Sequence, residues 1–318
     1  MPRLVVRRAS SLVALCLLSS VLAFLTPSAQ AASGRCRVHN LDSGRVTRGA
    51  GPNLQVSIEA ANPFETLGIS GRCNGTFLVK KGLTFQGIPT GEVPLPTLDA
   101  HHAGVVLTTG KGPVTIDGLR IVNGDRNDFG GGIEGHGTLR VIDSAIRNDR
   151  AVYGGGGIFS AGPLIVGGDT VISDNTARLG AGIYGRDTML MRDASTVHDN
   201  VARRGGGIIA ERALTLRDQA SVSANYASLL GGGILGVRRI TMSNTSVVQG
   251  NTAGRNGGGV YNQDVLKMND DATITGNIAT LGGGIFNRGL AQLVSCSATI
   301  VLSPNSPDDP PTAVCPTA

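Results

Sequence analysis

A run of three small residues followed by a β-branched residue occurs seven times between residues 130 and 285. The branched residues are Ile133, Ile158, Ile183, Ile208, Ile234, Val260 and Ile285, each preceded by Gly-Gly-Gly or Gly-Ala-Gly. Successive copies are separated by 25, 25, 25, 26, 26 and 25 residues. A period of about 20 to 50 residues is typical of proteins built from stacked repeats. The chain is therefore expected to form an elongated solenoid and not a compact globule.

Three short strands are expected in each repeat. Six and eight residues after the branched residue come apolar side chains, such as Leu139 and Val141. Later in the repeat comes an apolar residue, two spacers and an Asn; these asparagines are Asn175, Asn200, Asn225, Asn251 and Asn277. Three strands in one repeat make one coil of a parallel β-helix, in which equivalent positions stack about 4.8 Å apart. We therefore predict an all-β protein, a right-handed parallel β-helix of about ten coils.

The Asn and Gly columns have physical reasons. Asn tolerates the left-handed backbone that a tight corner needs, and its amide can bond the Asn of the next coil. Gly accounts for 47 of the 318 residues and is needed where the backbone turns with positive φ or coils approach closely. We expect the five asparagines to form a structural ladder along the helix.

The first 31 residues are predicted to be a secretion signal. Arg3, Arg7 and Arg8 precede an apolar run that is too short for a membrane span, and Ala29-Gln30-Ala31 fits the small-x-small cleavage pattern. Cleavage after Ala31 removes three Arg and no acids, so the net charge falls from +5 to 5 − 3 = +2. This charge argues for no nucleic-acid partner, and no second hydrophobic span follows. We expect a secreted protein, extracellular or associated with the cell wall.

The remaining chain divides into three segments. Residues 32–53 are expected to be an exposed leader, and residues 54–302 the β-helix. A short helix with Leu54, Ile58 and Ala61 on one face is expected to cap its open end. The Pro-rich residues 303–318 are assigned to a C-terminal cap or tail.

Four cysteines lie outside the repeats of the secreted chain. An even number of cysteines in an exported protein indicates disulfides. One pair lies at each end of the chain, so we predict the bonds Cys36–Cys73 and Cys296–Cys315. The two other pairings would require the ends of a long rod to meet.

The repeats contain two tetrapeptides that resemble the GGAI and FxxN repeats of chlamydial polymorphic outer-membrane proteins. Here they read Gly231-Gly232-Gly233-Ile234 and Val222-Ser223-Ala224-Asn225. More broadly, residues 54–305 resemble bacterial secreted right-handed parallel β-helix proteins of the pectate-lyase-like superfold. The resemblance implies this fold and an adhesin-like role.

The superfold also contains polysaccharide lyases and glycoside hydrolases, so catalytic candidates need to be weighed. Gly135-His136-Gly137 resembles a tripeptide of polygalacturonases, but their other motifs do not occur here in a matching order. Two acidic columns are further candidates: Asp193 with Asp218, and Asp174 with Asp199 beside His198. Stacked carboxylates can bind calcium or share acid and base roles. Because Asp also favours tight turns, we predict no catalytic set, no metal and no cofactor, with calcium possible if the protein is an enzyme.

The residue after each repeat Ile is the main binding candidate. Side chains alternate along a strand, so this column should point outward. It contains Phe159, Tyr184, Ile209, Leu235, Tyr261 and Phe286. An exposed ladder of this kind would stack sugar rings or contact a protein. The alternative is a structural column that stacks on itself or is covered by another part of the chain.

Arginines form a second candidate surface. They fall at predicted turns, at Arg203-Arg204, Arg212, Arg238-Arg239 and Arg255. A basic edge of this kind would bind acidic glycans, with an affinity that falls as salt rises. The alternative is a set of solvated turns that discourage aggregation.

These observations favour a secreted, non-enzymatic protein that binds extracellular polysaccharide or a surface protein. One alternative that stays open is that the protein is a polysaccharide lyase or glycoside hydrolase of the same superfold. A second alternative is a purely structural surface rod. The absence of an assembled catalytic set in the sequence favours the binding protein over the enzyme.

Overall fold

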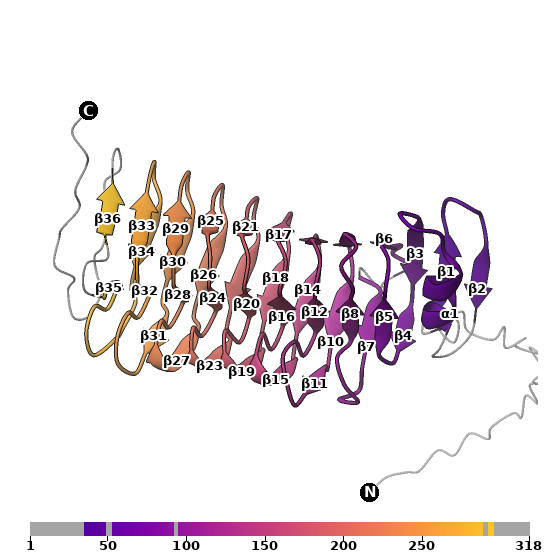
Figure 1. Cartoon of the computed structure of the whole chain (residues 1–318), viewed down its shortest axis with the longest axis horizontal. Coiled ribbons are helices and arrows are strands. Elements are labelled where there is room, and N and C mark those ends of the chain that lie inside the picture. Colours follow the sequence, from indigo (N-terminus) through magenta and orange to yellow (C-terminus); the bar gives the residue numbers. More distant parts are fainter. Residues whose placement is uncertain (1–34, 49–52, 92–94, 289–291, 296–318) are drawn as a thin grey trace, which may run out of the picture.

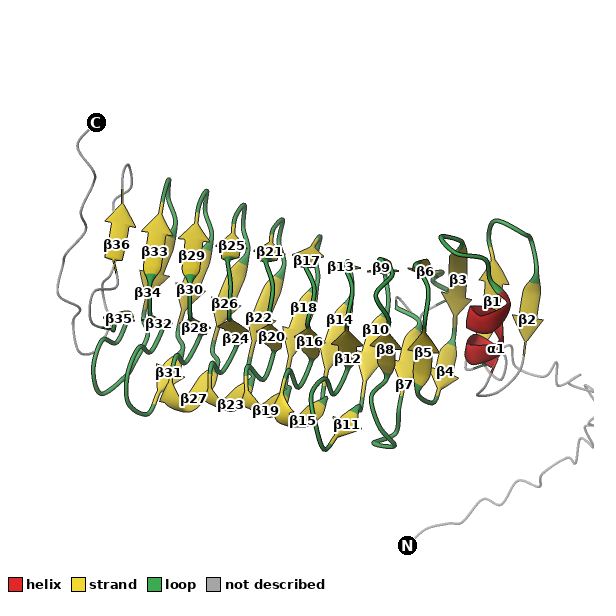
Figure 2. Ribbon diagram, viewed as in Figure 1, coloured by secondary structure: helices red, strands yellow, loops and turns green. Residues whose placement is uncertain are grey.

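The chain forms one long parallel β-solenoid, shown by a computed structural model that describes residues 35–48, 53–91, 95–288 and 292–295 (Figures 1 and 2). It is all-β apart from one short helix, so the predicted fold class is confirmed. The solenoid has about nine turns where ten were predicted. Nine coils contain all three walls, and of a tenth coil only one strand falls within the described residues.

Three parallel sheets form the walls of the solenoid, and a fourth, narrower sheet runs beside them. Wall 1 has twelve strands in the order β2 (Val46–Arg48), β1 (Arg37–Asn40), β3 (Thr66–Ser70), β6 (Leu83–Gly87), β9 (Val114–Asp117), β13 (Leu139–Ile142), β17 (Leu164–Gly167), β21 (Met189–Met191), β25 (Leu214–Leu216), β29 (Arg239–Met242), β33 (Val265–Met268) and β36 (Gln292–Ser295).

Wall 2 has nine strands, which are β4 (Arg72–Asn74), β7 (Thr97–Asp99), β10 (Arg120–Val122), β14 (Ala145–Arg147), β18 (Val171–Ser173), β22 (Thr196–His198), β26 (Ser221–Ser223), β30 (Val247–Gln249) and β34 (Thr273–Thr275). Wall 3 also has nine, which are β5 (Phe77–Val79), β8 (Leu107–Thr109), β12 (Ile133–Gly135), β16 (Ile158–Ser160), β20 (Ile183–Gly185), β24 (Ile208–Ala210), β28 (Ile234–Gly236), β32 (Val260–Asn262) and β35 (Ile285–Asn287).

The fourth sheet, here called the strip, was not expected. It lies between walls 2 and 3 in chain order and contains six strands, which are β11 (Asp125–Arg126), β15 (Arg150–Gly154), β19 (Thr176–Leu179), β23 (Val201–Arg204), β27 (Tyr226–Leu230) and β31 (Thr252–Ala253). The prediction of three strands per repeat was therefore wrong for the central coils, which have four. In Figure 1 the strip runs along the lower edge of the rod.

The bore of the solenoid is filled by stacks of equivalent apolar residues. Wall strands of neighbouring coils pair without a shift, so that Ile158 pairs with Ile183, and Leu164 with Met189. The repeat isoleucines and Val260 are between 0% and 4% exposed. Each coil on its own could not bury these side chains, and stacking removes them from water on both sides.

Each of the central coils turns at three corners where one residue has positive φ. One corner uses the first Gly of the repeated run, such as Gly155 (φ 66°) and Gly231 (φ 63°). A Cβ on Gly155 would lie 2.5 Å from the carbonyl oxygen of Ile158, so this position requires Gly. The other corners use Asp, Asn, Ala or Gly, including Asp193, Asp199 and Ala224. Gly adopts the left-handed conformation freely, and Asn and Asp tolerate it. Ala224 is the exception among these corner residues.

The five asparagines form the predicted ladder, but they are not the corner residues. The positive φ falls on the residue before each of them, such as Asp199 before Asn200. All five are buried. The amide Nδ2 of each of the first four donates to Oδ1 of the next, as from Asn200 to Asn225 at 2.9 Å. The same Nδ2 donates to a backbone carbonyl of the preceding coil, Ile172 O at 3.0 Å for Asn200. The ladder therefore satisfies buried backbone groups at the corner.

The N-terminal end of the bore is closed by a hairpin and a helix. Strands β1 and β2 extend wall 1 in antiparallel pairing, so this part of the predicted exposed leader is structured. The helix α1 (Asn53–Ala60) packs beside them, and Leu54, Ile58 and Ala61 are buried as predicted. The predicted disulfide Cys36–Cys73 is present. Of the described helical residues, none belongs to a helix long and apolar enough to cross a membrane.

Several predicted features lie outside the described residues. These are the signal peptide at residues 1–31, the bond Cys296–Cys315 and the Pro-rich segment 303–318. They stay predictions.

Candidate functional site

The predicted outward column on wall 3 is buried, so the expectation of an exposed ladder was wrong. Phe159, Tyr184, Ile209, Leu235 and Tyr261 are only 3–7% exposed, and Phe286 is half-buried. They form a second apolar core outside the bore, with Phe129, Leu179 and Leu230 packed against it. Leu179 and Leu230 belong to the strip, which folds over the outer face of wall 3. These six side chains consequently have a structural role, and we place no ligand on them.

The end of this second core near β16 and β20 is an aromatic cluster. The ring centroids of Phe129 and Phe159 are 4.8 Å apart, and those of Phe159 and Tyr184 are 5.7 Å apart. The guanidinium of Arg186 lies over all three rings, 5.0 Å from the centroid of Phe159. The Tyr184 hydroxyl donates to Glu211. The pKa of Tyr184 is raised, mainly because the side chain is partly buried and secondly because it bonds this carboxylate. The hydroxyl and the guanidinium at this cluster therefore already have partners within the chain.

Asp193 and Asp218 are corner residues of the solenoid. Each has φ of 58°. The carboxylate of Asp193 accepts the backbone N–H of Gly168 at 2.9 Å, and that of Asp218 accepts the N–H of Asp193 at 3.2 Å. Arg192 and Arg217 each lie 3.6 Å from the carboxylate of the following Asp. Both carboxylates therefore satisfy backbone groups of the neighbouring coil, which is the turn chemistry that was the alternative to catalysis.

The remaining catalytic candidates make only local contacts. Asp174 and Asp199 also occupy corners with positive φ. Asp174 accepts the hydroxyl of Ser173, and Asp199 lies 2.7 Å from Nδ1 of its neighbour His198. His136 Nε2 lies 3.3 Å from Glu134. The part of the chain that the structure describes holds no group of three or more His, Cys, Asp or Glu side chains arranged to bind a metal.

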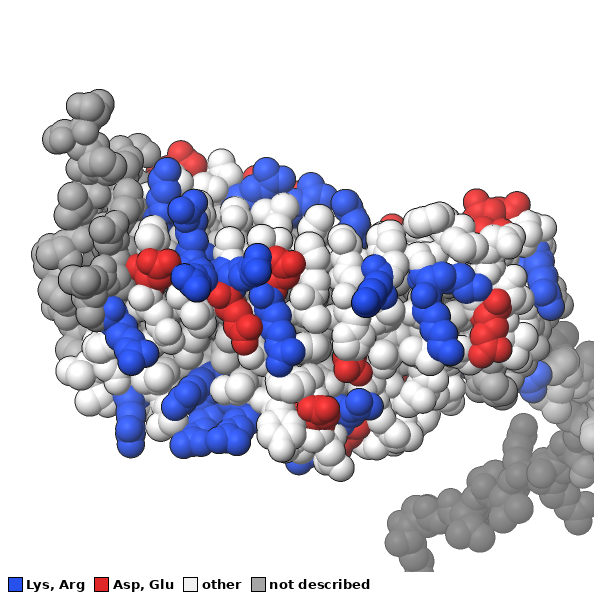
Figure 3. Space-filling view, in the orientation of Figure 1, with Lys and Arg blue, Asp and Glu red and all other residues white. Residues whose placement is uncertain are grey.

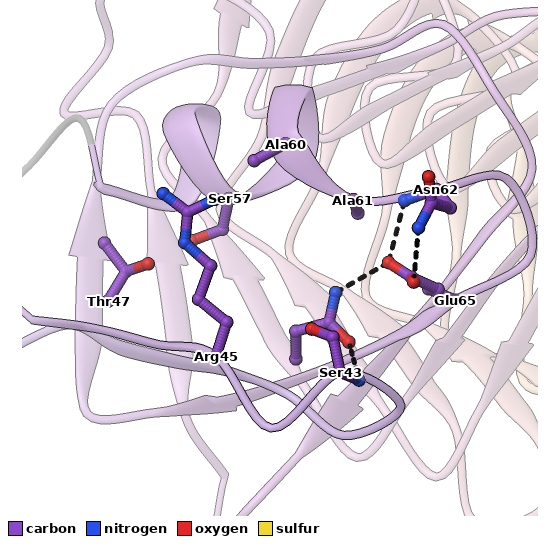
Figure 4. A pocket seen from close by; sticks show the side chains of 9 residues that line it. Ser43, Arg45, Thr47, Ser57, Ala60, Ala61, Asn62 and Glu65 are labelled. Atoms are coloured by element: carbon purple, nitrogen blue, oxygen red, sulfur yellow. Dashed lines mark hydrogen bonds between the residues drawn. The ribbon is translucent and has the colours of Figure 1, made fainter.

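A pocket of about 250 Å³ lies at the N-terminal end, between the β1–β2 hairpin and α1 (Figure 4). Arg45 and Ser57 line one side of it, and Asn40, Asn62 and Glu65 line the other. The Glu65 carboxylate accepts hydrogen bonds from Asn40 Nδ2 (2.7 Å), Asn62 Nδ2 (2.8 Å) and the Asn62 backbone N–H (2.7 Å), and these bonds lower the pKa of Glu65. The carboxylate is occupied by the cap, so the pocket is a junction within the cap and offers no free acidic group.

The predicted basic edge is divided between two places on the rod. Arg203 and Arg204 lie in β23 of the strip, and Arg255 lies just after β31, in the turn that leads from the strip to wall 3. Arg212 and Arg238 lie in the loops that lead from wall 3 to wall 1, and Arg239 begins β29. The prediction that all of these arginines fall at turns was wrong for Arg203, Arg204 and Arg239, which lie in strands. The two groups therefore lie on opposite sides of the wall 3 strands in chain order.

The outer side of the strip is an exposed surface with arginines and apolar side chains, here called the ridge. In β15, β19, β23, β27 and β31 an alanine column points inward, and the neighbours of each alanine point outward. The outward residues include Arg178 and Arg203 on adjacent strands, and Val201 and Tyr226, which are 47% and 44% exposed. Tyr226 pairs directly with Val201. Figure 3 shows basic side chains gathered along the lower edge of the rod, where Figure 1 places the strip.

Four arginines on or beside the ridge have no counter-charge among the described residues, whereas Arg150 of β15 lies 2.7 Å from Asp125. Arg178, Arg203, Arg204 and Arg255 are exposed, and none has a carboxylate within 4.0 Å in the part of the chain that the structure covers. Like charges at neighbouring positions of a sheet repel each other. The ridge thus presents several unpaired cations beside exposed apolar side chains.

The comparisons with known proteins give no relatives. No protein-family model, no curated protein and no solved structure matches this chain significantly. The function therefore has to be argued from the geometry described above.

Proposed function

We propose that this protein is a secreted, non-enzymatic binding protein that holds extracellular polysaccharide along the ridge, in the manner of an adhesin. The repeats that resemble those of bacterial secreted β-helix proteins support this reading, with the pectate-lyase-like superfold as the proposed family. The observation that carries the proposal is the row of unpaired ridge arginines next to exposed Val201 and Tyr226. Tyr rings stack on sugar rings, and guanidinium groups form paired hydrogen bonds with carboxylates and sulfates.

The spacing of the ridge suits a linear polymer. Strip strands of successive coils lie about 4.8 Å apart, so the outward side chains of the ridge, although of different types, stand at regular steps along the rod. A polymer lying along the axis would contact several coils at once, and weak contacts at each coil would add. The strip spans six coils, which limits the bound length to that part of the rod.

The proposal is tested by binding measurements on polygalacturonate, a sulfated glycan and a neutral glucan. The ridge variant carries Arg178→Gln, Arg203→Gln and Arg204→Gln. The control variant carries Arg212→Gln, Arg238→Gln and Arg239→Gln, which removes the same charge from the edge between walls 3 and 1. An exposed ion pair contributes about 0.2–1 kcal/mol, so losing three is expected to weaken binding of an acidic glycan about tenfold.

Four outcomes would decide between the functions. Binding of an acidic glycan that weakens with salt and with the ridge variant, but not with the control variant, supports the proposal. Equal loss in both variants refutes the ridge as the site. Release of unsaturated products or reducing sugar from any of these glycans would instead support the lyase or hydrolase. A rod that binds none of them would support the purely structural role.

A further inference from the structure

Three arginines gather on the outer face of wall 2, and none of them belongs to the strip. Arg72 lies in β4, Arg120 in β10 and Arg147 in β14, and β4, β7, β10 and β14 are consecutive neighbours in wall 2. Arg72 and Arg120 occupy one outward column, since both pair with Thr97. Arg147 occupies the next outward column, where it pairs with Val122. These three residues are called the wall 2 arginine cluster below.

Only one of the three arginines has an acidic partner. Nη2 of Arg72 lies 3.0 Å from Asp99. Asp99 is buried and also accepts the backbone N–H of His101 and the amide of Asn123, so its carboxylate has little capacity left. Within residues 35–48, 53–91, 95–288 and 292–295, neither Arg120 nor Arg147 has a carboxylate within 4.0 Å.

The guanidinium groups of Arg120 and Arg147 are held against the wall without acceptors. The Nε atoms of both are buried and have no hydrogen-bond partner among the described residues. Their terminal nitrogens are not among the buried atoms without a partner, and both arginines are partly exposed. Burial, and then repulsion from Arg147 and Arg72, lower the pKa of Arg120. Unpaired buried donors and like charges in contact range both cost free energy in the free protein.

The fold does not require cations at these positions. Farther along wall 2, the column of Arg120 continues with Ala145, Val171 and Thr196. The column of Arg147 continues with Ser173, His198 and Ser223. Small or neutral side chains therefore satisfy the same backbone geometry, and the cluster is a local addition of charge to an otherwise neutral face.

We propose that the wall 2 arginine cluster is a binding site for an oxyanion, that is a phosphate, a sulfate or a carboxylate. The planar guanidinium offers parallel N–H donors that match the oxygen atoms of such a group. An oxyanion between Arg120 and Arg147 accepts from their terminal nitrogens and supplies the missing negative charge, and Arg72 adds a third cation at the edge. The site is independent of the ridge and of the function proposed for it.

The test is calorimetric titration of the full secreted chain with sulfate, with phosphate, and with a sulfated and a uronic oligosaccharide, at matched ionic strength in chloride. We expect saturable 1:1 binding of at least one of these anions. Arg120→Gln and Arg147→Gln are each expected to weaken it at least about tenfold. Arg140→Gln is the matched control, because Arg140 is an exposed arginine of β13 in wall 1 without an acidic partner among the described residues.

The conservative variant Arg147→Lys keeps the charge but removes the planar fork, and it is expected to bind more weakly than the native protein. It also serves if the Gln variants fail to fold, which circular dichroism would show. Binding of the free ions identifies a small oxyanion as the ligand, and binding of the oligosaccharides alone identifies the charged group of a glycan. Absence of saturable binding to all four, or the same loss in Arg140→Gln, would overturn the proposal. Loss of glycan binding in the ridge variant alone would leave this site intact.

Discussion

Replacing Asp149 by Asn is predicted to stabilise the protein at neutral pH. Asp149 occupies the ladder position of its coil, where the following coils have Asn175, Asn200, Asn225, Asn251 and Asn277. Its Oδ1 accepts the backbone N–H of Gly124 at 2.6 Å, and its own N–H donates to Asn175 Oδ1 at 3.0 Å. Its Oδ2 is buried and has no partner among the described residues. In the asparagines this position is the Nδ2 donor, so an ionised Asp149 presents an acceptor where the ladder supplies a donor.

The size of the effect follows from this mismatch. Burial, as the largest cause, raises the pKa of Asp149 well above its ordinary value. A buried polar group without its partner costs about 1–3 kcal/mol. An asparagine side chain at this position would supply the missing donor, so Asp149→Asn should raise the free energy of unfolding by about 1–3 kcal/mol at neutral pH. The reverse change, Asn175→Asp, places the same mismatch one coil later and should lower it by a similar amount.

The pH dependence has a definite sign. The pKa of Asp149 is higher in the folded than in the unfolded chain, so the folded state binds more protons. Stability then falls as pH rises above the unfolded value of about 3.9, until the raised folded pKa is passed. The advantage of Asp149→Asn should therefore be small near pH 3.5 and grow toward neutral pH. Urea unfolding followed by far-UV circular dichroism at about pH 3.5, 5.5 and 7.5 measures it. The reasoning would be refuted if the variant were no more stable than the native protein at neutral pH. It would also be refuted if the gain in free energy of unfolding were the same at all three pH values.

Three further predictions use the same unfolding assay. Asn225→Ala removes the acceptor of Asn200 and the donor to Asn251 and should destabilise the rod by about 1–3 kcal/mol for each group left unpaired; a loss below about 0.5 kcal/mol would contradict the ladder. Phe159→Ala empties a position that is 3% exposed and should cost about 3–5 kcal/mol, whereas an exposed side chain would cost within about 0.5 kcal/mol. Cys36→Ser with Cys73→Ser opens a loop with a separation of 37 residues and should cost about 3–4 kcal/mol; an unchanged free energy of unfolding would contradict a stabilising role of the bond.

The side chains that fill the bore could be predicted from the sequence because the fold restricts the residue types there most strongly. Ile158 and Ile183 must match because they touch, and Asn200 and Asn225 must match because their amides bond each other. Such columns repeat, and a repeat is visible without a structure. The disulfide Cys36–Cys73 was also predictable, since four cysteines at two ends leave one short pairing at each.

The outer layer was harder to predict because alternation tells on which side of a wall a residue lies, and not what covers it. Tyr184 does point away from the bore, yet it is 7% exposed because the strip covers it. The strip strands were missed since their outward columns mix Thr176, Val201 and Tyr226 and show no repeated apolar pattern along the rod. One signal was present: the buried alanines Ala202 and Ala227 stand two residues after each ladder Asn, and small buried residues indicate close packing of another layer.

Departures from the columns are where function is to be sought in a rod of this kind. The side chain of a column residue must fit against the equivalent residues of the two neighbouring coils, so stacking alone explains its identity. Arg120 and Arg147 have no such explanation, because Ala145 and Ser173 serve the same backbone positions in adjacent coils. A charge placed where a small neutral residue would suffice imposes desolvation and repulsion on the free protein. The ridge arginines Arg178 and Arg203 differ in this respect, since they are exposed and their repulsion is screened by solvent. The free protein therefore bears a larger electrostatic cost at wall 2, and a bound anion would relieve more of it there than on the ridge.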